Sequence, residues 1–508
     1  MKKKTPPLSH RPPVVVVVGH IDHGKSTLLD YIRKTSVTET EAGGITQKIS
    51  AYEVKHRRLP DNKAGENGIE ETITFLDTPG HAAFSSIRER SILIADLAVV
   101  VISAEEGVKA QTLEALGAVT NAGLPYIIAI NKIDRPNTNV DRIKQSLTEN
   151  SILVEGYGGT IPCLPISAKT GEGIPELLEL ILLMADLLEL TTDPNVPATG
   201  FVLEATKHPQ VGIVTTLIIK NGYLRLGDFL IVGNLVGRIK KLENFQNKNI
   251  STLEASSPAV VIGLPEIPPA GAPFTTTNDK KTAEASAHQS AEGRASNITG
   301  QLTVAEGVVM LPLILKADNQ GSLEAVKKEV EKLNTETMNF SIIYSAVGQI
   351  IENDVKLGVG TRPAIIIGFN TRVDRNVVEI AEKYGIVIKT FNIIYHLCEW
   401  LAEEIIHQTP VAEVEKTIGE IRVLKIFSHE KNRQIIGASV TQGLVAPRYR
   451  VRITRRGTPL GEGEITEIKQ QKSSVKRVKI GDQFGALVES KIVIAPGDVL
   501  LIFTREKH

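Results

Sequence analysis

Residues 14–26 read VVVVVGHIDHGKS, and this stretch decides the fold of the first third of the chain. Five valines in a row are typical of a strand buried on both faces of a parallel sheet. The glycines that follow let backbone N–H groups curl around a phosphate, and a helix start adds favourable partial charge. A strand, the pattern GxxxxGK[ST] and a helix together predict a phosphate-binding loop, with Lys25 at the β- and γ-phosphates and Ser26 on Mg²⁺.

Short β-branched runs recur after this loop, for example at Leu97–Ile102 and Tyr126–Ile130. They alternate with stretches whose apolar residues have helical spacing, such as Gln111–Asn121. This alternation predicts a doubly wound P-loop α/β domain over residues 13–192, with binding loops at the carboxyl ends of its parallel strands. Residues 1–12 are expected to form an N-terminal tail.

A magnesium-binding turn follows the strand predicted at Ile73–Leu76, where the chain continues with Asp77-Thr78-Pro79-Gly80. An aspartate at a strand end can hold Mg²⁺ through a water molecule, and the Gly80 N–H can contact the γ-phosphate. Such a turn is weak evidence by itself. In this position after a phosphate loop, it supports a nucleoside triphosphate site.

The residues that read the base follow two later strands, at Asn131-Lys132-Ile133-Asp134 and at Ser167-Ala168-Lys169. Asp134 can accept hydrogen bonds from the N1–H and the exocyclic amine of guanine, whereas adenine would leave the carboxylate unpaired. The ligands predicted here are therefore GTP and GDP with Mg²⁺, in preference to ATP. The predicted nucleotide-binding residues are Gly19, His20, Ile21, Asp22, His23, Gly24, Lys25, Ser26, Thr27, Asp77, Gly80, Asn131, Lys132, Asp134, Ser167, Ala168 and Lys169.

The rest of the chain is predicted to form further domains of the α/β and β classes. Short strands separated by glycine turns predict a small β-barrel over residues 197–274. Residues 275–305 contain few large apolar side chains and are predicted to be a flexible linker. Alternating strands and helices resume over residues 306–392, a connecting helix is expected over 393–410, and strands with glycine turns predict a C-terminal β-barrel over 411–508.

Charge and cysteine content restrict the class of protein. Lys+Arg and Asp+Glu both number 58, so the composition as a whole indicates no polyanionic partner. Residues 410–508, however, carry 18 Lys and Arg against 11 Asp and Glu, which suits a nucleic-acid contact or a solvated face.

Cys163 and Cys398 stand alone, which fits a reducing cytosol better than a disulfide scaffold or zinc site. Because apolar runs near the N-terminus are far shorter than the ~20 residues of a membrane span, we expect a cytoplasmic protein without membrane contact.

The order of these motifs resembles that of one family of translational GTPases. The phosphate loop with its histidines and the segment Asp77–His81 mark translational GTPases generally. The segments Glu41–Gln47 (EAGGITQ) and Lys316–Ala325 (KADNQGSLEA) are more specific, and Ile367–Asn370 extends the match. The chain resembles the bacterial translation initiation factor 2 family over nearly its whole length, apart from residues 275–305.

This resemblance implies roles for residues around the phosphates. Thr46 would supply a second protein ligand to Mg²⁺ when GTP is bound. His81 would be the catalytic residue that positions or polarises the attacking water, once the ribosome pushes it towards the γ-phosphate. By the same resemblance, the metal ligands are Ser26, Thr46 and Asp77, the apolar gate is Ile21 with Ile45, and Asp22 is a candidate ligand of a monovalent cation.

The resemblance also places the formyl-methionyl end of initiator tRNA on the last barrel, where the basic excess suits an acceptor stem. Where the family usually has cysteines, this chain has Ala438 and the segment Gln483-Phe484-Gly485. The alternation along Arg448–Ile453 is also what the solvated face of a strand would show. The candidate tRNA-binding residues are Arg448, Arg450, Lys469 and Lys472, with Arg452, Arg455 and Arg456 nearby.

We therefore predict a GTP-hydrolysing translation initiation factor, expected to be a monomer that binds both ribosomal subunits and formyl-methionyl initiator tRNA. One alternative is another translational GTPase, such as an elongator or a specialised tRNA carrier. A second alternative is a GTP-sensing, ribosome-binding protein in which the altered last barrel no longer recognises initiator tRNA.

Overall fold

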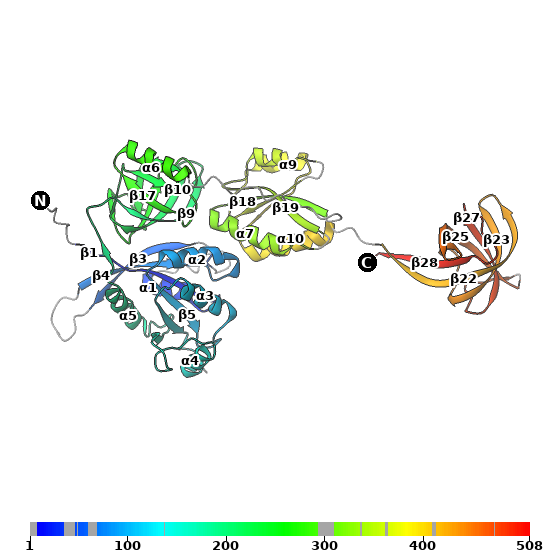
Figure 1. The fold of residues 1–508 in the computed structure, drawn as a ribbon, viewed down its shortest axis with the longest axis horizontal. Coiled ribbons are helices and arrows are strands. Elements are labelled where there is room, and N and C mark those ends of the chain that lie inside the picture. Colours follow the sequence, from blue (N-terminus) through cyan, green and yellow to red (C-terminus); the bar gives the residue numbers. More distant parts are fainter. Residues whose placement is uncertain are drawn as a thin grey trace. The chain divides into compact units, whose positions relative to one another are not determined.

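The computed structural model describes residues 8–34, 46–47, 49–58, 69–136, 138–292, 309–335, 338–360, 364–408, 413–471 and 473–507. The chain divides into two units, Met1–His407 and Gln408–His508 (Figure 1). The first unit contains three successive domains and the second contains one. Each unit is described by itself below.

The first domain is built on a six-stranded sheet whose core strand is the run of valines. Its strand order is β3-β4-β2-β5-β6-β7, with β3 antiparallel to β4 and the others parallel. Val14, Val16 and Val18 pack on one face and Val15 and Val17 on the other, so all five are buried. The strands are β2 (Val14–Gly19), β3 (Ser50–Arg58), β4 (Ile69–Asp77), β5 (Leu97–Ser103), β6 (Tyr126–Asn131) and β7 (Cys163–Pro165).

Helices cover both faces of this sheet, as a doubly wound fold requires. Apolar residues of α2, α3 and α4 pack on one face, and those of α1 and α5 pack on the other. The loops that carry the predicted nucleotide motifs leave the carboxyl ends of β2, β4, β6 and β7. The helices are α1 (Lys25–Arg33), the 3-10 turn η3 (Ala82–Phe84), α2 (Ser85–Ile94), α3 (Ala110–Asn121), α4 (Val140–Glu149) and α5 (Ile174–Leu187).

The expected N-terminal tail over residues 1–12 is wrong for the part that the structure describes. β1 (Ser9–His10) pairs with β8 (Thr191–Thr192), and the Arg11 N–H donates to the Leu190 carbonyl oxygen at 3.0 Å. The short strand was missed because its partner lies at the far end of the domain. Residues 1–7 lie outside the described part of the chain.

The second domain is a β-barrel. Its strand order is β13-β12-β17-β9-β10-β16-β14, and the two end strands are joined by only two residues, which brings the edges of the sheet together. Its strands are β9 (Thr199–His208), β10 (Gly212–Asn221), β12 (Phe229–Val232), β13 (Leu235–Arg238), β14 (Lys241–Asn244), β16 (Pro258–Ile262) and β17 (Pro273–Thr277), with a separate pair β11 (Tyr223–Arg225) and β15 (Thr252–Glu254).

The flexible linker predicted at residues 275–305 is wrong over its first half. β17 continues to Thr277, and α6 (Lys280–Glu292) packs on the barrel (Figure 1). Ala283 and Ala287, one helical turn apart, are buried there. Small side chains let a helix approach a sheet closely, so the low content of large apolar residues did not indicate disorder. Residues 293–308 lie outside the described part.

The third domain has a parallel four-stranded sheet in the order β19-β18-β20-β21. Helices α7 and α10 pack on one face, and α8 and α9 pack on the other (Figure 1). The elements are β18 (Val309–Ala317), α7 (Gln320–Lys332), β19 (Met338–Val347), α8 (Glu352–Gly358), β20 (Ile365–Phe369), α9 (Arg375–Lys383), β21 (Ile388–Phe391) and α10 (Ile394–Gln408).

The helix expected to connect domains over residues 393–410 is part of the third domain. Ile394, Leu397 and Leu401 of α10 are buried in the same apolar cluster as the sheet residues Leu313 and Ile367. The helical spacing of its apolar residues correctly predicts a helix, but an apolar face of this width needs a packing partner. The third domain's own sheet supplies it.

The second unit is a closed β-barrel. Its strands follow the order β24-β28-β22-β23-β27-β25-β26, and an additional pairing of β24 with β25 closes the ring. The inside is filled by aliphatic residues of alternating positions, such as Val451 and Ile453. Its strands are β22 (Glu413–Glu430), β23 (Arg433–Gly443), β24 (Arg450–Arg455), β25 (Thr458–Gln470), β26 (Ser473–Ser474), β27 (Gln483–Ser490) and β28 (Val499–Lys507).

The predicted multidomain architecture, with a P-loop α/β domain, a β-barrel, a second α/β domain and a C-terminal barrel, is confirmed. Among the described residues, no helix is both long enough and apolar enough to cross a membrane.

A buried carboxylate ties the first domain to the second. Asp96 accepts hydrogen bonds from Arg11 at 2.7 and 2.8 Å, from the Val14 N–H at 2.9 Å and from Lys220 of the barrel at 2.5 Å. Burial by itself would raise the pKa of Asp96, but the hydrogen bond from Arg11 and the charges of Lys220 and Arg11 outweigh it and lower the pKa.

We expect Asp96→Asn to lower the free energy of unfolding by about 3 kcal/mol, because two cations lose their buried partner. The matched control is Asp186→Asn, which breaks only an exposed pair with Arg58 and should cost under about 1 kcal/mol. Because folding depresses the pKa of Asp96, its contribution is present above the pKa of the unfolded chain and is lost as the pH falls. Urea unfolding at several pH values measures both effects, and equal losses in the two variants would contradict the assignment.

Candidate functional site

The phosphate loop begins where β2 comes very close to β5. A Cβ atom on Gly19 would lie 2.4 Å from the Val101 carbonyl oxygen, and both Gly19 and Gly24 have positive φ angles, of 149° and 86°. Only glycine meets both conditions at position 19. The loop then wraps around Lys25, which is 6% exposed and donates to the His20 carbonyl oxygen at 2.7 Å.

Lys25 remains a cation at neutral pH. Burial lowers the pKa of Lys25 to about 8, against the opposing effect of the Asp77 carboxylate. An ammonium group without its full hydration shell gains a strong partner when an anion enters. The loop is therefore suited to hold a phosphate.

A cavity of about 370 Å³ lies over this loop. It brings together the phosphate loop, Thr46, the turn after β4 and the start of α10 from the third domain. Its lining residues are Ile21, Asp22, Gly24, Lys25, Ser26, Thr27, Thr46, Gly80, His81, Lys132, Arg135 and Tyr395.

Three oxygen-bearing side chains fit a magnesium ion, and two of them, Ser26 and Thr46, line this cavity. The hydroxyl oxygens of Ser26 and Thr46 lie 2.8 Å apart, although they are 20 residues apart in sequence. Asp77, at the end of β4, is 7% exposed. Mg²⁺ prefers oxygen ligands of this kind, so these three residues would hold the ion. Ile45, predicted as half of the apolar gate, lies outside the described residues, whereas Ile21 lines the cavity.

The two base-reading segments are bonded to each other and to the phosphate loop. The Asn131 amide donates to the His23 carbonyl oxygen at 2.9 Å and accepts from the Ala168 N–H at 2.9 Å. The Ser167 hydroxyl donates to Asp134 at 2.7 Å, and this hydrogen bond is the main reason that the pKa of Asp134 is lowered. Asp134 is exposed, and Lys132, two residues before it, lines the cavity next to the phosphate loop.

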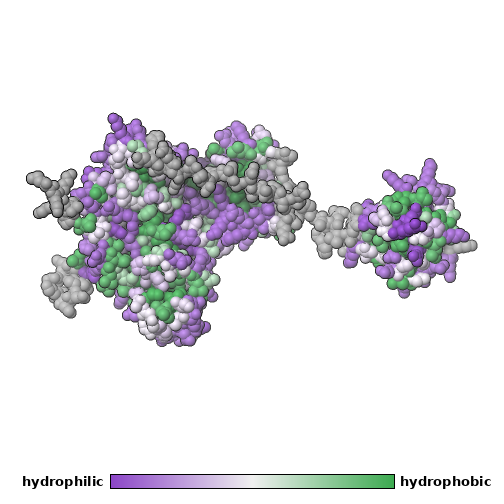
Figure 2. Space-filling model, viewed as in Figure 1, coloured by the Kyte–Doolittle hydropathy of each residue, from purple (hydrophilic) through white to green (hydrophobic). Residues whose placement is uncertain are grey.

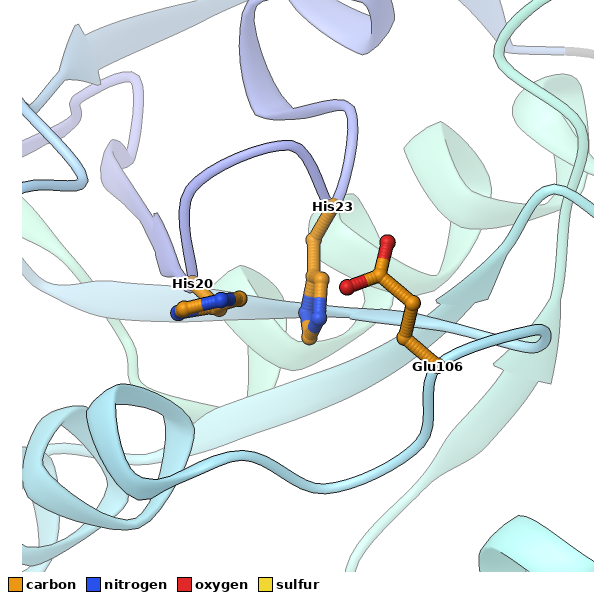
Figure 3. Close-up of side chains that lie close together, drawn as sticks. All are labelled: His20, His23 and Glu106. Carbon is orange, nitrogen blue, oxygen red and sulfur yellow. The ribbon is translucent and has the colours of Figure 1, made fainter.

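Not every predicted residue lines the cavity. Asn131, Ser167 and Ala168 are buried behind it as a support for the loop, and the exposed Lys169 follows them. The side chains of His20 and His23 do not line the cavity, and they lie next to each other and to Glu106 (Figure 3). Burial lowers the pKa of His23 to about 3, so this imidazole is neutral.

The turn after β4 places His81 at the cavity in a restrained position. Its Nδ1 accepts from the Ala83 N–H at 2.8 Å, and its ring lies edge-on to Tyr395 with centroids 4.4 Å apart. Burial lowers the pKa of His81, so the ring is neutral near pH 7 and can orient a water molecule.

Two contacts that the sequence did not predict hold this region. Arg88 of α2 is 3% exposed and donates to the carbonyl oxygens of Pro79, Gly80 and His81 at 3.2, 3.3 and 2.7 Å. Gln47, next to Thr46, donates to the Asn392 carbonyl oxygen of the third domain at 2.8 Å. Nothing local marks either residue, because each contact depends on how distant elements pack.

A second candidate site lies on the C-terminal barrel, where hydrophobic residues are exposed on the face seen in Figure 2. A cavity of about 760 Å³ there has Leu424, Phe427 and Ile435 among its apolar walls and Lys469 at its polar side. Arg448 and Arg450 are exposed but do not line it, and Lys472 lies outside the described residues. Among the neighbouring arginines, Arg452 pairs with Glu462 at 3.0 Å and Arg455 with Asp498 at 2.8 Å.

Four family models match successive parts of the chain. They describe the elongation factor Tu GTP binding domain (residues 10–186), elongation factor G domain 2 (197–277), translation-initiation factor 2 (284–402) and elongation factor Tu domain 4 (418–501). The third of these models starts inside α6, within the stretch that had been predicted as a linker.

The chain is similar to whole proteins as well. It is 40% identical to translation initiation factor IF-2 of Clostridium botulinum (strain Loch Maree / Type A3), over 98% of this chain and 72% of that protein. It is also 40% identical to translation initiation factor IF-2 of Roseiflexus sp. (strain RS-1), over 98% of this chain and 68% of that protein. Among solved structures, the GDP-bound aIF5B from Aeropyrum pernix has 26% identity and a TM-score of 0.45, over 97% of this chain and 92% of that one.

Replacing Asp134 tests the base-reading assignment. We expect Asp134→Asn to weaken GDP binding about tenfold or more, since hydrogen bonds to a charged acceptor contribute roughly 1.5–3 kcal/mol each. Xanthosine diphosphate should gain affinity, because the amide can donate to its extra carbonyl oxygen. Competition against a fluorescent GDP analogue measures this.

The matched control for this test is Asp141→Asn, an exposed aspartate of the same domain that bonds to the Tyr157 hydroxyl at 3.1 Å. It should leave both affinities unchanged. Because the pKa of Asp134 is lowered, GDP binding by the unsubstituted protein should stay constant from neutral to mildly acidic pH. Unaltered GDP affinity in Asp134→Asn would show that another group reads the base.

Proposed function

We propose that this chain, which belongs to the translation initiation factor 2 family of GTP hydrolases, carries out a cycle of GTP binding and hydrolysis at the start of protein synthesis. The GTP-bound form promotes binding of formyl-methionyl initiator tRNA to the small ribosomal subunit and the joining of the large subunit. GTP is then hydrolysed on the assembled ribosome and the factor leaves. The factor acts as a monomer in the cytoplasm.

The observation that carries the hydrolytic part is the meeting of Lys25, Thr46 and His81 at one cavity. Lys25 would neutralise phosphate charge, and Ser26, Thr46 and Asp77 would hold Mg²⁺, which would supply further charge neutralisation when bound. Phosphoryl transfer needs a placed water and compensated charge more than a strong base. A neutral His81 at the same cavity can orient that water.

His81 is in a resting position in the free protein. The Ala83 N–H occupies its Nδ1, and the Tyr395 ring packs against its edge. We infer that the ring leaves these contacts when it orients a water at the γ-phosphate. We infer that the ribosome causes this movement and that hydrolysis is very slow without it.

We expect His81→Ala to leave GTP affinity nearly intact and to remove the ribosome-stimulated turnover. The reason is that the ring makes no contact that a phosphate needs, but is required to place the water. Single-turnover hydrolysis with and without ribosomes measures the effect. The control is His56→Ala, which removes a histidine of β3 that pairs with Glu179 of α5. This variant should hydrolyse GTP normally. Normal stimulated turnover in His81→Ala would clear His81 of this role.

The barrel cavity supports the initiator-tRNA part of the proposal. Its apolar walls can accept a methionine side chain, and Lys469 can contact the backbone of the tRNA end. Phe427 is 63% exposed and leans over Gly437, where a Cβ atom would come within 2.8 Å of the ring. Leu424 and Ile435 of the same cavity are 47% and 44% exposed, and a group of exposed apolar side chains is typical of a binding surface.

Filter binding tests this part. We expect the protein to retain formyl-methionyl initiator tRNA in preference to unformylated elongator tRNA, and Phe427→Ala to weaken that binding about tenfold or more, as for an aromatic anchor worth over about 1.4 kcal/mol. Ile480→Ala is the matched control, because Ile480 is also 63% exposed on this barrel but does not line the cavity. It should bind normally.

A second candidate function has one specific observation in its favour. Ala438, Phe484 and Gly485 line the cavity, at positions where the family resemblance implies cysteine-containing segments. If these replacements have removed the recognition of formyl-methionine, the protein is a GTP-sensing, ribosome-binding factor. Equal or absent retention of the two tRNAs would support this second function and overturn the first.

A further inference from the structure

The two histidines of the phosphate loop present ring nitrogens that the nucleotide cavity does not use. Their side chains meet that of Glu106, from the loop after β5, and one ligand atom from each residue lies within 4.8 Å of the others (Figure 3). Within the described ranges of the chain, His20, His23 and Glu106 are the single group of three or more His, Cys, Asp or Glu side chains that converge in this way.

His23 has a free lone pair in a fully buried place. Its side chain is 0% exposed, and its Nδ1 lies 3.3 Å from the Val101 carbonyl oxygen. A carbonyl oxygen can only accept, so Nδ1 carries the proton and Nε2 has the lone pair. Nε2 has no hydrogen-bond partner among the residues that the structure describes. Buried polar atoms in proteins normally have one, so this nitrogen is available to a ligand from outside the chain.

His20 is prepared in the same way. Its Nδ1 contacts the side-chain oxygen of Gln111, which also accepts, so Nε2 again has the lone pair. The two rings lie edge-on with centroids 4.9 Å apart. Histidines that bind metals characteristically donate the other ring N–H to an oxygen acceptor, which fixes the ring and the tautomer. Both histidines of this loop meet that description.

We propose that His20, His23 and Glu106 form a binding site for a divalent transition metal of the Zn²⁺ class. Two imidazole nitrogens and one carboxylate are a common zinc set that leaves a fourth position for water. A tetrahedral ion with ligands at about 2.0–2.2 Å would draw the three atoms to about 3.3–3.6 Å from one another. The exposed Glu106 side chain can make this movement. The site is separate from the Mg²⁺ site, whose ligands are oxygens.

Both metal-binding loops also serve the nucleotide. Glu106 now faces the Lys132 ammonium at 3.3 Å, and the His20 carbonyl oxygen accepts from Lys25 at 2.7 Å. A metal would take Glu106 from Lys132 and fix the loop in the form in which Lys25 is bonded to His20. Because a loop held in its nucleotide-free form adjusts less readily to a phosphate, the metal weakens nucleotide binding, and the nucleotide weakens metal binding by the same factor.

Cobalt substitution tests the site in the full-length protein. With Mg²⁺ in excess, a Co²⁺ titration should give visible d–d bands that saturate at one ion per chain, without the near-ultraviolet band of thiolate coordination. Glu106→Gln should lower the Co²⁺ affinity about tenfold or more, since even a lost outer-sphere partner costs roughly 10–100-fold. The matched control, Glu105→Gln, removes the neighbouring carboxylate, which pairs with Arg135, and should bind Co²⁺ normally.

The same samples test the link to the nucleotide. Zn²⁺ should weaken GDP binding about fivefold or more in the unsubstituted protein and in Glu105→Gln, and should have no such effect in Glu106→Gln. Absent d–d bands, a thiolate band from Cys163 or Cys398, or equal Co²⁺ affinity in the two variants would overturn the site. A GDP affinity that does not change when Zn²⁺ binds would overturn the proposed link between metal and nucleotide binding. None of these results depends on tRNA or ribosome binding.

Discussion

The contact between Gly19 and the Val101 carbonyl oxygen is the constraint on which the nucleotide site depends. The two strands run side by side, and a Cβ atom on Gly19 would lie 2.4 Å from that oxygen. The same oxygen is 3.3 Å from Nδ1 of His23. The loop therefore leaves β2 at Gly19, beside Val101, and contacts Val101 again at His23, four residues later. From His23 the hydrogen bonds continue to Asn131 and then to Ala168. The Val101 carbonyl oxygen thereby helps to hold both the phosphate loop and the base-reading segments in position.

The other half of the site is held by the third domain. Phe84 and Ile87, which follow His81, are buried in the same apolar cluster as Leu323 and Leu397 of that domain. Gly321 permits this contact, because a Cβ atom there would lie 2.6 Å from Ile87. Arg90 and Glu324 add an ion pair at 2.8 Å across the same boundary. A movement of the turn that carries His81 therefore changes the packing of the third domain, and the reverse is equally true.

The sequence predicted the elements whose signals are local. Valine runs, glycine turns and the residues at strand ends gave the P-loop domain and its motif residues, because each needs only its own neighbours in the chain. Features that depend on a distant partner were missed or misread, including the pairing of β1 with β8 and the packing of α6 through Ala283 and Ala287. Arg88 and Tyr395 belong to the same class. Their roles exist only once the turn at His81 lies between α2 and α10.

The cavity on the barrel of the second unit depends on how strands β23 and β27 are paired, and the amino-acid composition does not reveal this pairing. Its interior is filled by aliphatic side chains, so a ligand has to bind on the outside. There, Gly437 of β23 lies directly opposite Gly485 of β27, and a cross-strand pair without side chains leaves a hollow. Phe427 leans into that hollow while remaining largely exposed. In the sequence, either glycine by itself predicts only a turn or a less stable position in a strand. The two line a cavity only because the strands pair them.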